Sequence, residues 1–346
     1  MIIYIPSFIS ENPFITQLVN SLLLNDDVDD VLTGIELFKK DEIIYDIILF
    51  QWPEVLLHWK LPNDDDLLFL KKKIKLLKDN QVKIIATVHN LFPHKGCNLN
   101  TENLYRLIYE NCDRIVHLGK SSKKIFKETV GYSIEESKEV VIKHGNYNYF
   151  ENKINNENAR ELFRIMKGKF VLLSFGHIRN IQEFKLILKV ADYLKKRNGL
   201  VLISGKLFEK NKKRLRYYLL RIPLYIRKNI IFKDGFVNDS EVQNYLNACD
   251  SLFIPRSKSL NSGNVALGFT FGKVVIGENF GVIGEELTLR NNPTFDLKIE
   301  KSVEKSIDRA IILSKTDIGK RNKEYSQTEL SWETISNSYV SLFKSI

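Results

Sequence analysis

Short apolar runs alternate with stretches of helical period along nearly the whole chain. Runs of this kind are typical of buried strands, and the longer stretches between them are typical of amphipathic helices. In the first half the predicted strands are Ile2–Ile5, Val31–Phe38, Asp46–Phe50, Lys83–Val88, Arg114–Leu118 and Val140–Ile142. The predicted helices between them include Phe14–Leu24, Leu67–Lys78, Thr101–Asn111 and Ser121–Thr129.

The pattern starts again after Glu151–Ala159, a polar, Asn-rich segment that predicts a linker. The later strands are Phe170–Phe175, Leu200–Ile203, Ile230–Phe232, Ser251–Ile254, Lys273–Gly277 and Thr294–Asp296, and the later helices include Gln182–Lys196, Ser240–Ala248 and Val303–Ser314. Strands that alternate with helices of this length favour βαβ units and parallel sheets. We therefore expect an α/β fold of two doubly wound, Rossmann-like domains, 1–155 and 156–330, with a last helix at 331–346 that packs back on the first. In such folds ligands bind beyond the carboxyl ends of the strands, so a central cleft between the domains is the expected site.

Composition narrows the class of protein without identifying it. The chain has 346 residues, of which 44% are apolar and 27% charged, as in ordinary globular proteins. No apolar run approaches the ~18–20 residues of a membrane span, and the start has no basic region typical of a secretory signal. Cys97, Cys112 and Cys249 lie too far apart in sequence for a CxxC metal site. A cytoplasmic protein is expected.

The net charge of +10 favours anionic partners. No nucleic-acid-binding motif, Walker A sequence or GxGxxG is present, so nucleic acid is not an expected partner. Lys210–Lys228 carries a dense set of cations interleaved with apolar residues. Such a stretch fits either a peripheral contact with an anionic membrane or a solvated helix face over the core.

Candidate chemistry in the first half follows two predicted strands. His89 and His94 come after Lys83–Val88 and can act as bases or hydrogen-bond a sugar or phosphate. The alternative is that His89 is a structural residue and His94 a surface loop residue. Trp52 and Glu54 come after Asp46–Phe50, where an aromatic ring and a carboxylate can meet a sugar, or pack under a loop.

In the second half the candidates favour a phosphorylated ligand. Gly176 permits close approach after a strand, and Arg179 can pair with a diphosphate, unless it is a surface arginine after a turn. The loop that leads into Val265–Phe271 presents small polar residues and backbone N–H groups at a helix start, an arrangement that binds phosphate or simply caps the helix. The candidates there are Arg256, Asn261, Ser262, Gly263 and Asn264. Glu285 and Glu286 follow a Gly turn and can accept ribose hydroxyls or favour a helix start.

The ordered set of short motifs resembles the GT-B glycosyltransferases, in particular the GT4-like group of bacterial surface-polysaccharide enzymes. The matching pieces cover nearly the whole chain: Asn12–Phe14, Gln51–Glu54, Thr87–His94, Lys143–Tyr147, Phe175–Arg179, Asp234–Val237, Ala248–Asp250, Leu260–Gly263 and Trp332–Glu333. The resemblance implies a nucleotide-sugar donor on the second domain and an acceptor on the first, near Asn12, Trp52 and His144.

The chain departs from the family pattern at three positions. Many members carry two glutamates eight positions apart before the equivalent of Gly272, where this chain has Ser259 and Leu267. Gln182 replaces the usual lysine after Arg179. The candidate substitutes are Lys206, Glu285 and Glu286.

The leading hypothesis is a metal-independent hexosyltransferase that moves a sugar from a UDP- or GDP-linked donor to a glycan or lipid-linked saccharide, in assembly of bacterial capsule, exopolysaccharide or O-antigen. No cofactor is expected besides the donor, which is a substrate. If the reaction inverts, His89, His94 or Glu54 is the base. The alternatives are a non-catalytic GT-B homologue that binds a glycan or a partner transferase, and a sugar-nucleotide 2-epimerase.

Overall fold

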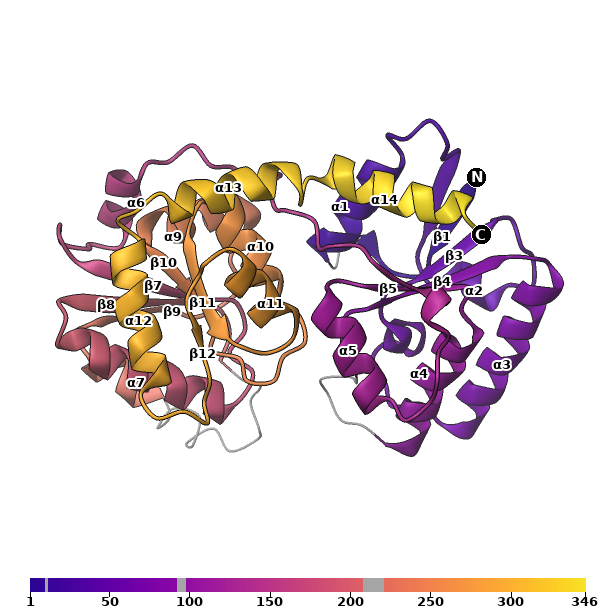
Figure 1. Cartoon of the computed structure of the whole chain (residues 1–346), viewed down its shortest axis with the longest axis horizontal. Helices are drawn as coiled ribbons and strands as arrows, with labels where there is room; N and C mark the ends of the chain where they lie inside the picture. The colour runs from indigo at the N-terminus through magenta and orange to yellow at the C-terminus, as the bar shows by residue number, and fades with distance from the viewer. Residues whose placement is uncertain (10–11, 92–97, 208–220) are drawn as a thin grey trace. The chain divides into compact units, whose positions relative to one another are not determined.

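The computed structural model describes residues 1–9, 12–91, 98–207 and 221–346. The chain divides into two compact units, Met1–Gly145 with Glu329–Ile346, and Asn146–Thr328. Within the described residues each unit contains one six-stranded parallel sheet with helices packed against it (Figure 1). The expected α/β fold with two parallel sheets is confirmed.

The first sheet has the order β2-β1-β3-β4-β5-β6. Its strands are β1 (Ile2–Ile5), β2 (Asp30–Thr33), β3 (Ile47–Phe50), β4 (Lys83–Val88), β5 (Arg114–His117) and β6 (Glu139–Val141). The helices of this unit are α1 (Pro13–Leu22), α2 (Glu36–Lys39), α3 (Asp64–Asp79), α4 (Leu99–Asn111), α5 (Lys120–Thr129) and α14 (Trp332–Lys344). The strand order reverses between β1 and β3, which makes the carboxyl ends of these two strands the topological switch point.

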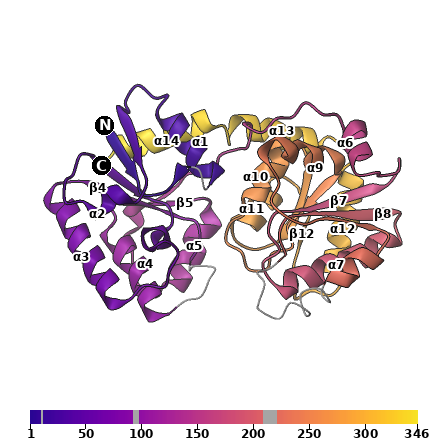
Figure 2. The same ribbon diagram turned by 180° about the vertical axis from the view of Figure 1, so that it is seen from behind.

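Helices α1 and α14 lie side by side on one face of this sheet, and α3 and α4 lie side by side on the other (Figures 1 and 2). Their apolar stripes bury Phe14 and Leu18 of α1 and Tyr339 of α14 against Ile3 and Ile5 of β1. The C-terminal helix therefore completes the core of the N-terminal unit, although more than 300 residues separate Phe14 from Tyr339 in sequence.

The predicted strand Val31–Phe38 is wrong beyond Thr33. Strand β2 ends there, Gly34 takes a left-handed backbone conformation (φ +91°), and Glu36–Lys39 forms α2. The Tyr4 hydroxyl explains the turn: it donates to the Gly34 carbonyl oxygen at 2.7 Å and accepts from the Phe38 N–H at 2.9 Å. A side chain from β1 thus overrides the local β-propensity.

The second sheet has the order β12-β11-β10-β7-β8-β9. Its strands are β7 (Phe170–Phe175), β8 (Gly199–Ser204), β9 (Ile230–Lys233), β10 (Ser251–Phe253), β11 (Val274–Glu278) and β12 (Thr294–Phe295). Its helices include α6 (Asn156–Leu162), α7 (Ile181–Lys195), α9 (Val242–Ala248), α10 (Gly263–Thr270), α11 (Gly281–Leu289), α12 (Ser302–Leu313) and α13 (Ile318–Thr328). The order reverses between β7 and β10, so this unit has its own switch point at their carboxyl ends.

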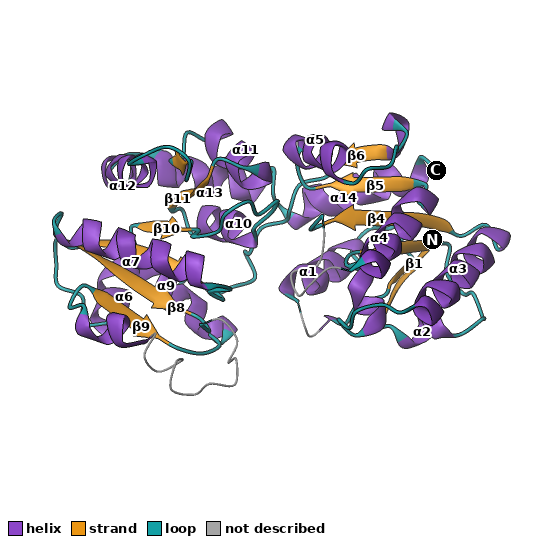
Figure 3. Ribbon diagram, turned by 90° about the horizontal axis from the view of Figure 1, so that it is seen from below, coloured by secondary structure: helices purple, strands orange, loops and turns teal. Residues whose placement is uncertain are grey.

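Helix α7 lies along β8 (Figure 3), and with α12 it covers one face of the sheet. The other face receives α10, whose Gly268 lets the helix approach the sheet closely. A Cβ at Gly268 would lie 2.4 Å from the Val275 side chain of β11. This close packing fixes where the first turn of α10 lies, and that turn borders the switch point.

The boundary between the units lies ten residues before the predicted position at 155, because the preceding segment is bonded to the second unit. Gln243 Oε1 accepts from the backbone N–H groups of Lys153 and Ile154 at 2.8 and 3.1 Å. The Asn247 side chain donates to the Ile154 carbonyl oxygen at 2.9 Å. The polar, Asn-rich segment is therefore a docked strap on the second unit.

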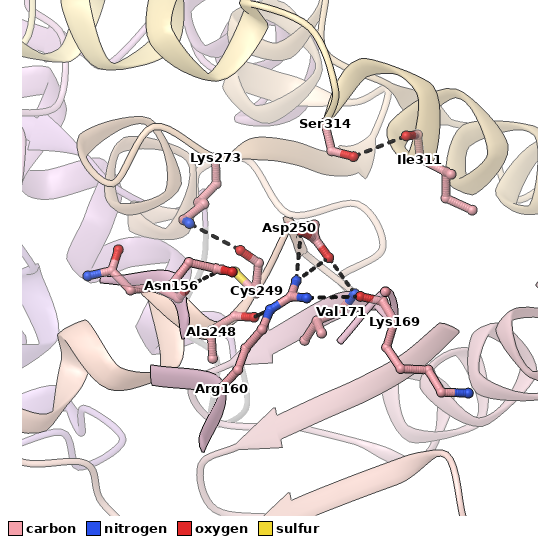
Figure 4. A network of polar contacts seen from close by, with 12 residues as sticks. Asn156, Arg160, Lys169, Val171, Ala248, Cys249, Asp250, Lys273, Ile311 and Ser314 are labelled. Carbon is pink, nitrogen blue, oxygen red and sulfur yellow. Dashed lines mark hydrogen bonds and ion pairs between the residues drawn. The ribbon is translucent and has the colours of Figure 1, made fainter. Parts of the chain in front are cut away.

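A charged network closes the amino ends of β7 and β10 (Figure 4). Both carboxylate oxygens of Asp250 accept from Arg160 Nη2 at 2.8 Å, and the Val171 N–H donates to the same carboxylate at 2.7 Å. Arg160 also donates to the carbonyl oxygens of Ala248 and Lys169. These bonds engage the Arg160 guanidinium and the Asp250 carboxylate, so the network holds this end of the sheet together.

Candidate functional site

Each unit presents a group of side chains at its own switch point. In the first unit they come from the segments that follow β1, β3 and β4, joined by the segment after β6 and the start of α14. In the second they come from the segments that follow β7, β8 and β10. Ligands of doubly wound sheets bind at such points. The two groups differ in chemistry.

An aromatic cluster occupies the switch point of the first unit, with Phe14 at its centre. The Phe14 ring makes edge contacts with His89 (5.1 Å between centroids), Trp332 (5.4 Å) and Trp52 (6.4 Å). It also contacts the His144 ring in a tilted arrangement at 4.9 Å. Trp52 and His89 stack on each other at 4.1 Å with 20° between their planes. The cluster therefore joins five rings from five segments.

His89 is buried and uncharged at neutral pH. Its Nε2 lies 2.7 Å from Gln51 Oε1 and, because an amide oxygen only accepts, this contact places the proton on Nε2. Burial, with a smaller effect of the neighbouring His144, lowers the pKa of His89 to about 3. A neutral imidazole can form a hydrogen bond and adds no charge to the aromatic cluster.

The segment after β6 brings His144 to the cluster and fits tightly against α14. The His144 Nδ1–H donates to the Gly145 carbonyl oxygen at 2.6 Å, and burial lowers the pKa of His144. A Cβ at Gly145 would lie 2.4 Å from the Trp332 indole, so only glycine leaves room for this ring. Asn12 is the N-cap of α1. Its side chain accepts from the Phe14 N–H at 3.0 Å and so fixes where the helix starts.

Glu54 is held apart from these rings by α4. The Tyr105 hydroxyl donates to Glu54 Oε2 at 2.6 Å, the carboxyl group is buried, and burial raises the pKa of Glu54. The structure thus brings together Trp52, His89 and His144, and places Glu54 in an internal contact. His94 lies outside the described residues. Sequence reasoning missed the central role of Phe14, because its partners are spread over the whole length of the unit.

Two glycines shape the switch point of the second unit. Gly176 and Gly205 both have left-handed φ angles, +93° and +131°, at the carboxyl ends of the adjacent strands β7 and β8. A Cβ at Gly205 would lie 2.1 Å from the Gly176 carbonyl oxygen. Beyond them the Ile178 N–H donates to the Lys206 carbonyl oxygen at 2.9 Å, and the Lys206 side chain is exposed. The glycines let the chain turn here without side chains that would fill the space.

Arg179 and Arg256 form a cationic pair at this edge. Burial and the positive charge of Arg179 lower the pKa of Arg256 to about 10, and burial likewise lowers that of Arg179. Both guanidinium groups still carry charge at pH 7. The buried Glu183 carboxylate opposes the two charges and accepts from the Arg179 N–H at 2.8 Å. Two like charges in a partly buried place are unfavourable, and an anion bound beside them would offset their repulsion.

The start of α10 adds backbone donors to the same edge. Ser262 precedes the helix, makes no side-chain cap to it, and its hydroxyl instead accepts from Arg256 Nη1 at 2.9 Å. The Asn264 side chain donates to the Phe175 carbonyl oxygen at 2.8 Å, which ties the first turn of α10 to the end of β7. Asn261 and Gly263 are half-buried beside them. The first turn of α10 thus lies at the switch point without a cap from Ser262.

The acidic candidates of α11 differ from each other. Glu286 is buried, and the Tyr325 hydroxyl of α13 donates to its Oε2 at 2.7 Å, so this carboxylate is engaged inside the unit. Glu285 is half-buried. A carboxylate that sequence reasoning missed, Glu278 at the end of β11, accepts from the Ser257 hydroxyl at 3.3 Å and from the Lys258 N–H. Glu278 therefore holds the loop that leads into α10.

The basic stretch Lys210–Lys228 lies partly outside the described residues. Its described part is helical over residues 221–226, where Ile222, Tyr225 and Ile226 are exposed and Leu224 is buried. Among the described helices none is both long and apolar enough to cross a membrane. Nor do the described residues hold three His, Cys, Asp or Glu side chains grouped so that they could bind a metal ion.

No family model matches the chain, and no curated protein matches it in sequence. Solved structures match over its full length. Sucrose-phosphate synthase from Thermosynechococcus elongatus has a TM-score of 0.74 at 13% identity, with 100% of this chain and 98% of that chain covered. Anabaena HepE in complex with UDP-glucose has a TM-score of 0.73 at 12% identity, with 100% and 99% covered. WaaG, a glycosyltransferase involved in lipopolysaccharide biosynthesis, has a TM-score of 0.61 at 10% identity, with 98% of each chain covered.

These likenesses define the class of fold. The two parallel α/β units, together with full-length matches to glycosyltransferase structures, identify the GT-B fold. At identities of 10–13% these matches establish only the fold. The activity of a fold of this kind depends on the side chains at its two switch points.

Proposed function

We propose that this protein is a glycosyltransferase that uses a nucleoside diphosphate sugar as donor and a saccharide as acceptor. The observation that carries the proposal is the pair Arg179 and Arg256, two partly buried cations beside the first turn of α10. Guanidinium groups and helix N-terminal N–H groups are both suited to bind a diphosphate.

The proposed chemistry uses this edge to stabilise the leaving group. As the acceptor oxygen bonds to the sugar and the bond between the sugar and the diphosphate breaks, negative charge grows on the leaving phosphate oxygen, which can take up the proton that the acceptor hydroxyl loses. Arg179, Arg256 and the N–H groups of Gly263 and Asn264 would stabilise that charge, and groups already fixed in place do so most effectively. Lys206, whose side chain is exposed at the same edge, is a further proposed donor contact.

We assign the acceptor to the first unit, where the aromatic cluster suits the apolar face of a sugar. Trp52, half-buried beside His89, offers a ring for such a contact. Because the pKa of His89 is about 3, its imidazole is unprotonated at pH 7, as a general base requires, yet it would hold a proton weakly. Buried and stacked on Trp52, His89 is better suited to hold that ring in place than to act as the base.

The finer identity of donor and acceptor is also a proposal. HepE has been solved with UDP and with UDP-glucose, which supports a UDP-linked donor, with a GDP-linked donor as the alternative. WaaG is involved in lipopolysaccharide biosynthesis, which supports a glycan or lipid-linked saccharide of the bacterial surface as acceptor. A lipid-linked acceptor would require contact with the membrane.

For that contact we propose the stretch Lys210–Lys228. Its described part exposes 47% of Ile222, 67% of Tyr225 and 69% of Ile226, three apolar side chains at helical spacing. Replacing all three with Ser should reduce sedimentation with anionic liposomes at low salt. Ile312→Ser, at a residue that is 65% exposed on α12, is the control and should sediment like wild type. Equal sedimentation of the triple variant would contradict the membrane contact.

The activity is tested by incubating the protein with UDP- and GDP-linked sugars, with and without saccharide acceptors, and following donor and products by NMR. The proposal predicts release of the nucleoside diphosphate that depends on Arg256 and is lost in Arg256→Ala. Arg197→Ala is the matched control. Arg197 lies just beyond the carboxyl end of α7, whereas Arg179 lies just before its amino end, and Arg197 is paired with Asp308. Release of free 2-epimerised sugar nucleotide without an acceptor would favour an epimerase. Binding without turnover would favour a non-catalytic homologue.

A further inference from the structure

A strained turn carries the exposed tryptophan of the first unit. The connection from β3 to α3 contains a short 3-10 helix, Pro53–Leu57, that ends at His58. His58 (φ 51°) and Trp59 (φ 61°) both take left-handed backbone conformations. Within the described ranges no other two successive non-glycine residues do so.

This backbone conformation is unfavourable for a residue with a bulky side chain. In the left-handed region Cβ approaches the backbone closely, and glycine avoids the penalty because it has no Cβ. The turn itself is well bonded, since the His58 N–H donates to the Val55 carbonyl oxygen and the Trp59 N–H to that of Glu54, both at 2.9 Å. Glycine at either position would keep these bonds without the penalty, so the turn itself does not require an indole.

Packing covers only about half of the Trp59 side chain. Trp59 is 48% exposed, whereas Trp52 and Trp332 make ring contacts within the aromatic cluster. An indole that combines a left-handed backbone with a half-exposed ring fits a binding role, because strain of this kind concentrates at functional sites. Trp59 also belongs to the same connection as Trp52 and Glu54, which leaves the carboxyl end of β3.

We propose that Trp59 is a stacking platform for a sugar ring of the acceptor, outside the aromatic cluster. This inference rests on the proposed function, because it names a residue that selects the acceptor. The indole offers a broad apolar face to the C–H groups of a pyranose, and its N–H can bond a hydroxyl. Lys60, exposed next to it, adds a further donor for sugar hydroxyl groups.

The test compares Trp59→Gly with His58→Gly. Both changes relieve a left-handed residue of the same turn, so both variants should unfold at the wild-type temperature or above it. The probes are methyl glucoside, galactoside, mannoside and N-acetylglucosaminide at 20–50 mM, observed by saturation-transfer NMR. We expect saturation transfer to at least one glycoside in wild type and in His58→Gly, and at least a fivefold loss in Trp59→Gly. Trp59→Phe should restore part of it.

Two outcomes would overturn the stacking role: equal saturation transfer in wild type and Trp59→Gly, or a clear drop in unfolding temperature for Trp59→Gly alone, which would mark a structural residue. Absence of transfer to every glycoside in wild type would also overturn it. UDP titrated into the same samples separates the two proposals. If UDP binds and Trp59→Gly changes nothing, only the stacking role fails. If UDP does not bind, the proposed function itself fails.

Discussion

The two switch points have the same topology and opposite chemistry. In the first unit five rings around Phe14 leave a neutral, aromatic surface in which both histidines have lowered pKa values. In the second unit two glycines, two arginines and the start of α10 form a cationic edge. Parallel α/β topology therefore fixes where each group of side chains is placed, and the side chains decide that one edge suits an uncharged ligand and the other an anion.

The two edges are also built by different interactions. The first is held by contacts between rings, so it should be sensitive to changes of side chain. The second depends on the close approach of Gly205 to the Gly176 carbonyl oxygen, so it should be sensitive to a single methyl group added at Gly205.

Gly205→Ala should have the largest effect on the free energy of unfolding. The new Cβ would lie 2.1 Å from the Gly176 carbonyl oxygen, at a φ of +131° that disfavours any side chain. We expect a loss of about 3–5 kcal/mol, measured by denaturant unfolding. Gly176→Ala is the control, because its Cβ would meet no atom within 4 Å, and it should lose only about 1–2 kcal/mol. Similar losses for both variants would contradict the close backbone contact.

Tyr105→Phe should have the next largest effect, in the first unit. It removes the donor from the buried Glu54 carboxyl group, and an unsatisfied buried acceptor costs about 1–3 kcal/mol. The matched control is Tyr109→Phe on the same helix, since the buried Tyr109 hydroxyl has no hydrogen-bond partner among the described residues. That variant should be as stable as wild type. Equal losses in the two variants would show that ring packing alone matters here.

The positions of the strands were predictable because each is a short apolar run between polar turns. Ile47–Phe50 and Phe170–Phe175, for example, are almost entirely buried and read clearly in the sequence. The exception is the segment after Thr33, where the Tyr4 hydroxyl imposes a turn on a stretch of strand-like composition. The local signal there is Gly34, which takes a left-handed conformation at the turn, but the Tyr4 hydroxyl that bonds the turn comes from another strand.

The candidate sites were predictable only in part. Arg179, Arg256 and His89 follow strands, so their place at a carboxyl edge could be inferred from topology. The hub residue Phe14 could not, because it contacts Trp332 from the far end of the chain. The need for glycine at 205 was equally hidden, because it depends on how closely two neighbouring strands approach beyond their ends.

A smaller effect should appear in the dependence of stability on pH. Unfolded His89 takes up a proton below about pH 6.5, whereas folded His89 does so only near pH 3. Its contribution to stability is therefore fully present above pH 6.5 and is lost as the pH falls toward 3, by at most about 1.4 kcal/mol per pH unit. In unfolding measurements between pH 7 and 4, His89→Asn should flatten this slope relative to wild type. His58→Asn serves as control for replacing a histidine at an exposed position.

The central claim is that the cationic edge of the second unit binds a nucleoside diphosphate, and calorimetric titration with UDP and with uridine tests it most directly. We expect UDP to bind and uridine to bind far more weakly, because the diphosphate supplies the anion. Arg179→Ala and Arg256→Ala should each weaken UDP binding by about 1.5–3 kcal/mol, which is roughly 10- to 150-fold, while Arg197→Ala leaves it unchanged. Without ligand, Arg256→Ala should be as stable as wild type or slightly more so, since it removes repulsion between two cations. Equal affinity for UDP in wild type and in both edge variants, or equal affinity for UDP and uridine, would contradict the account.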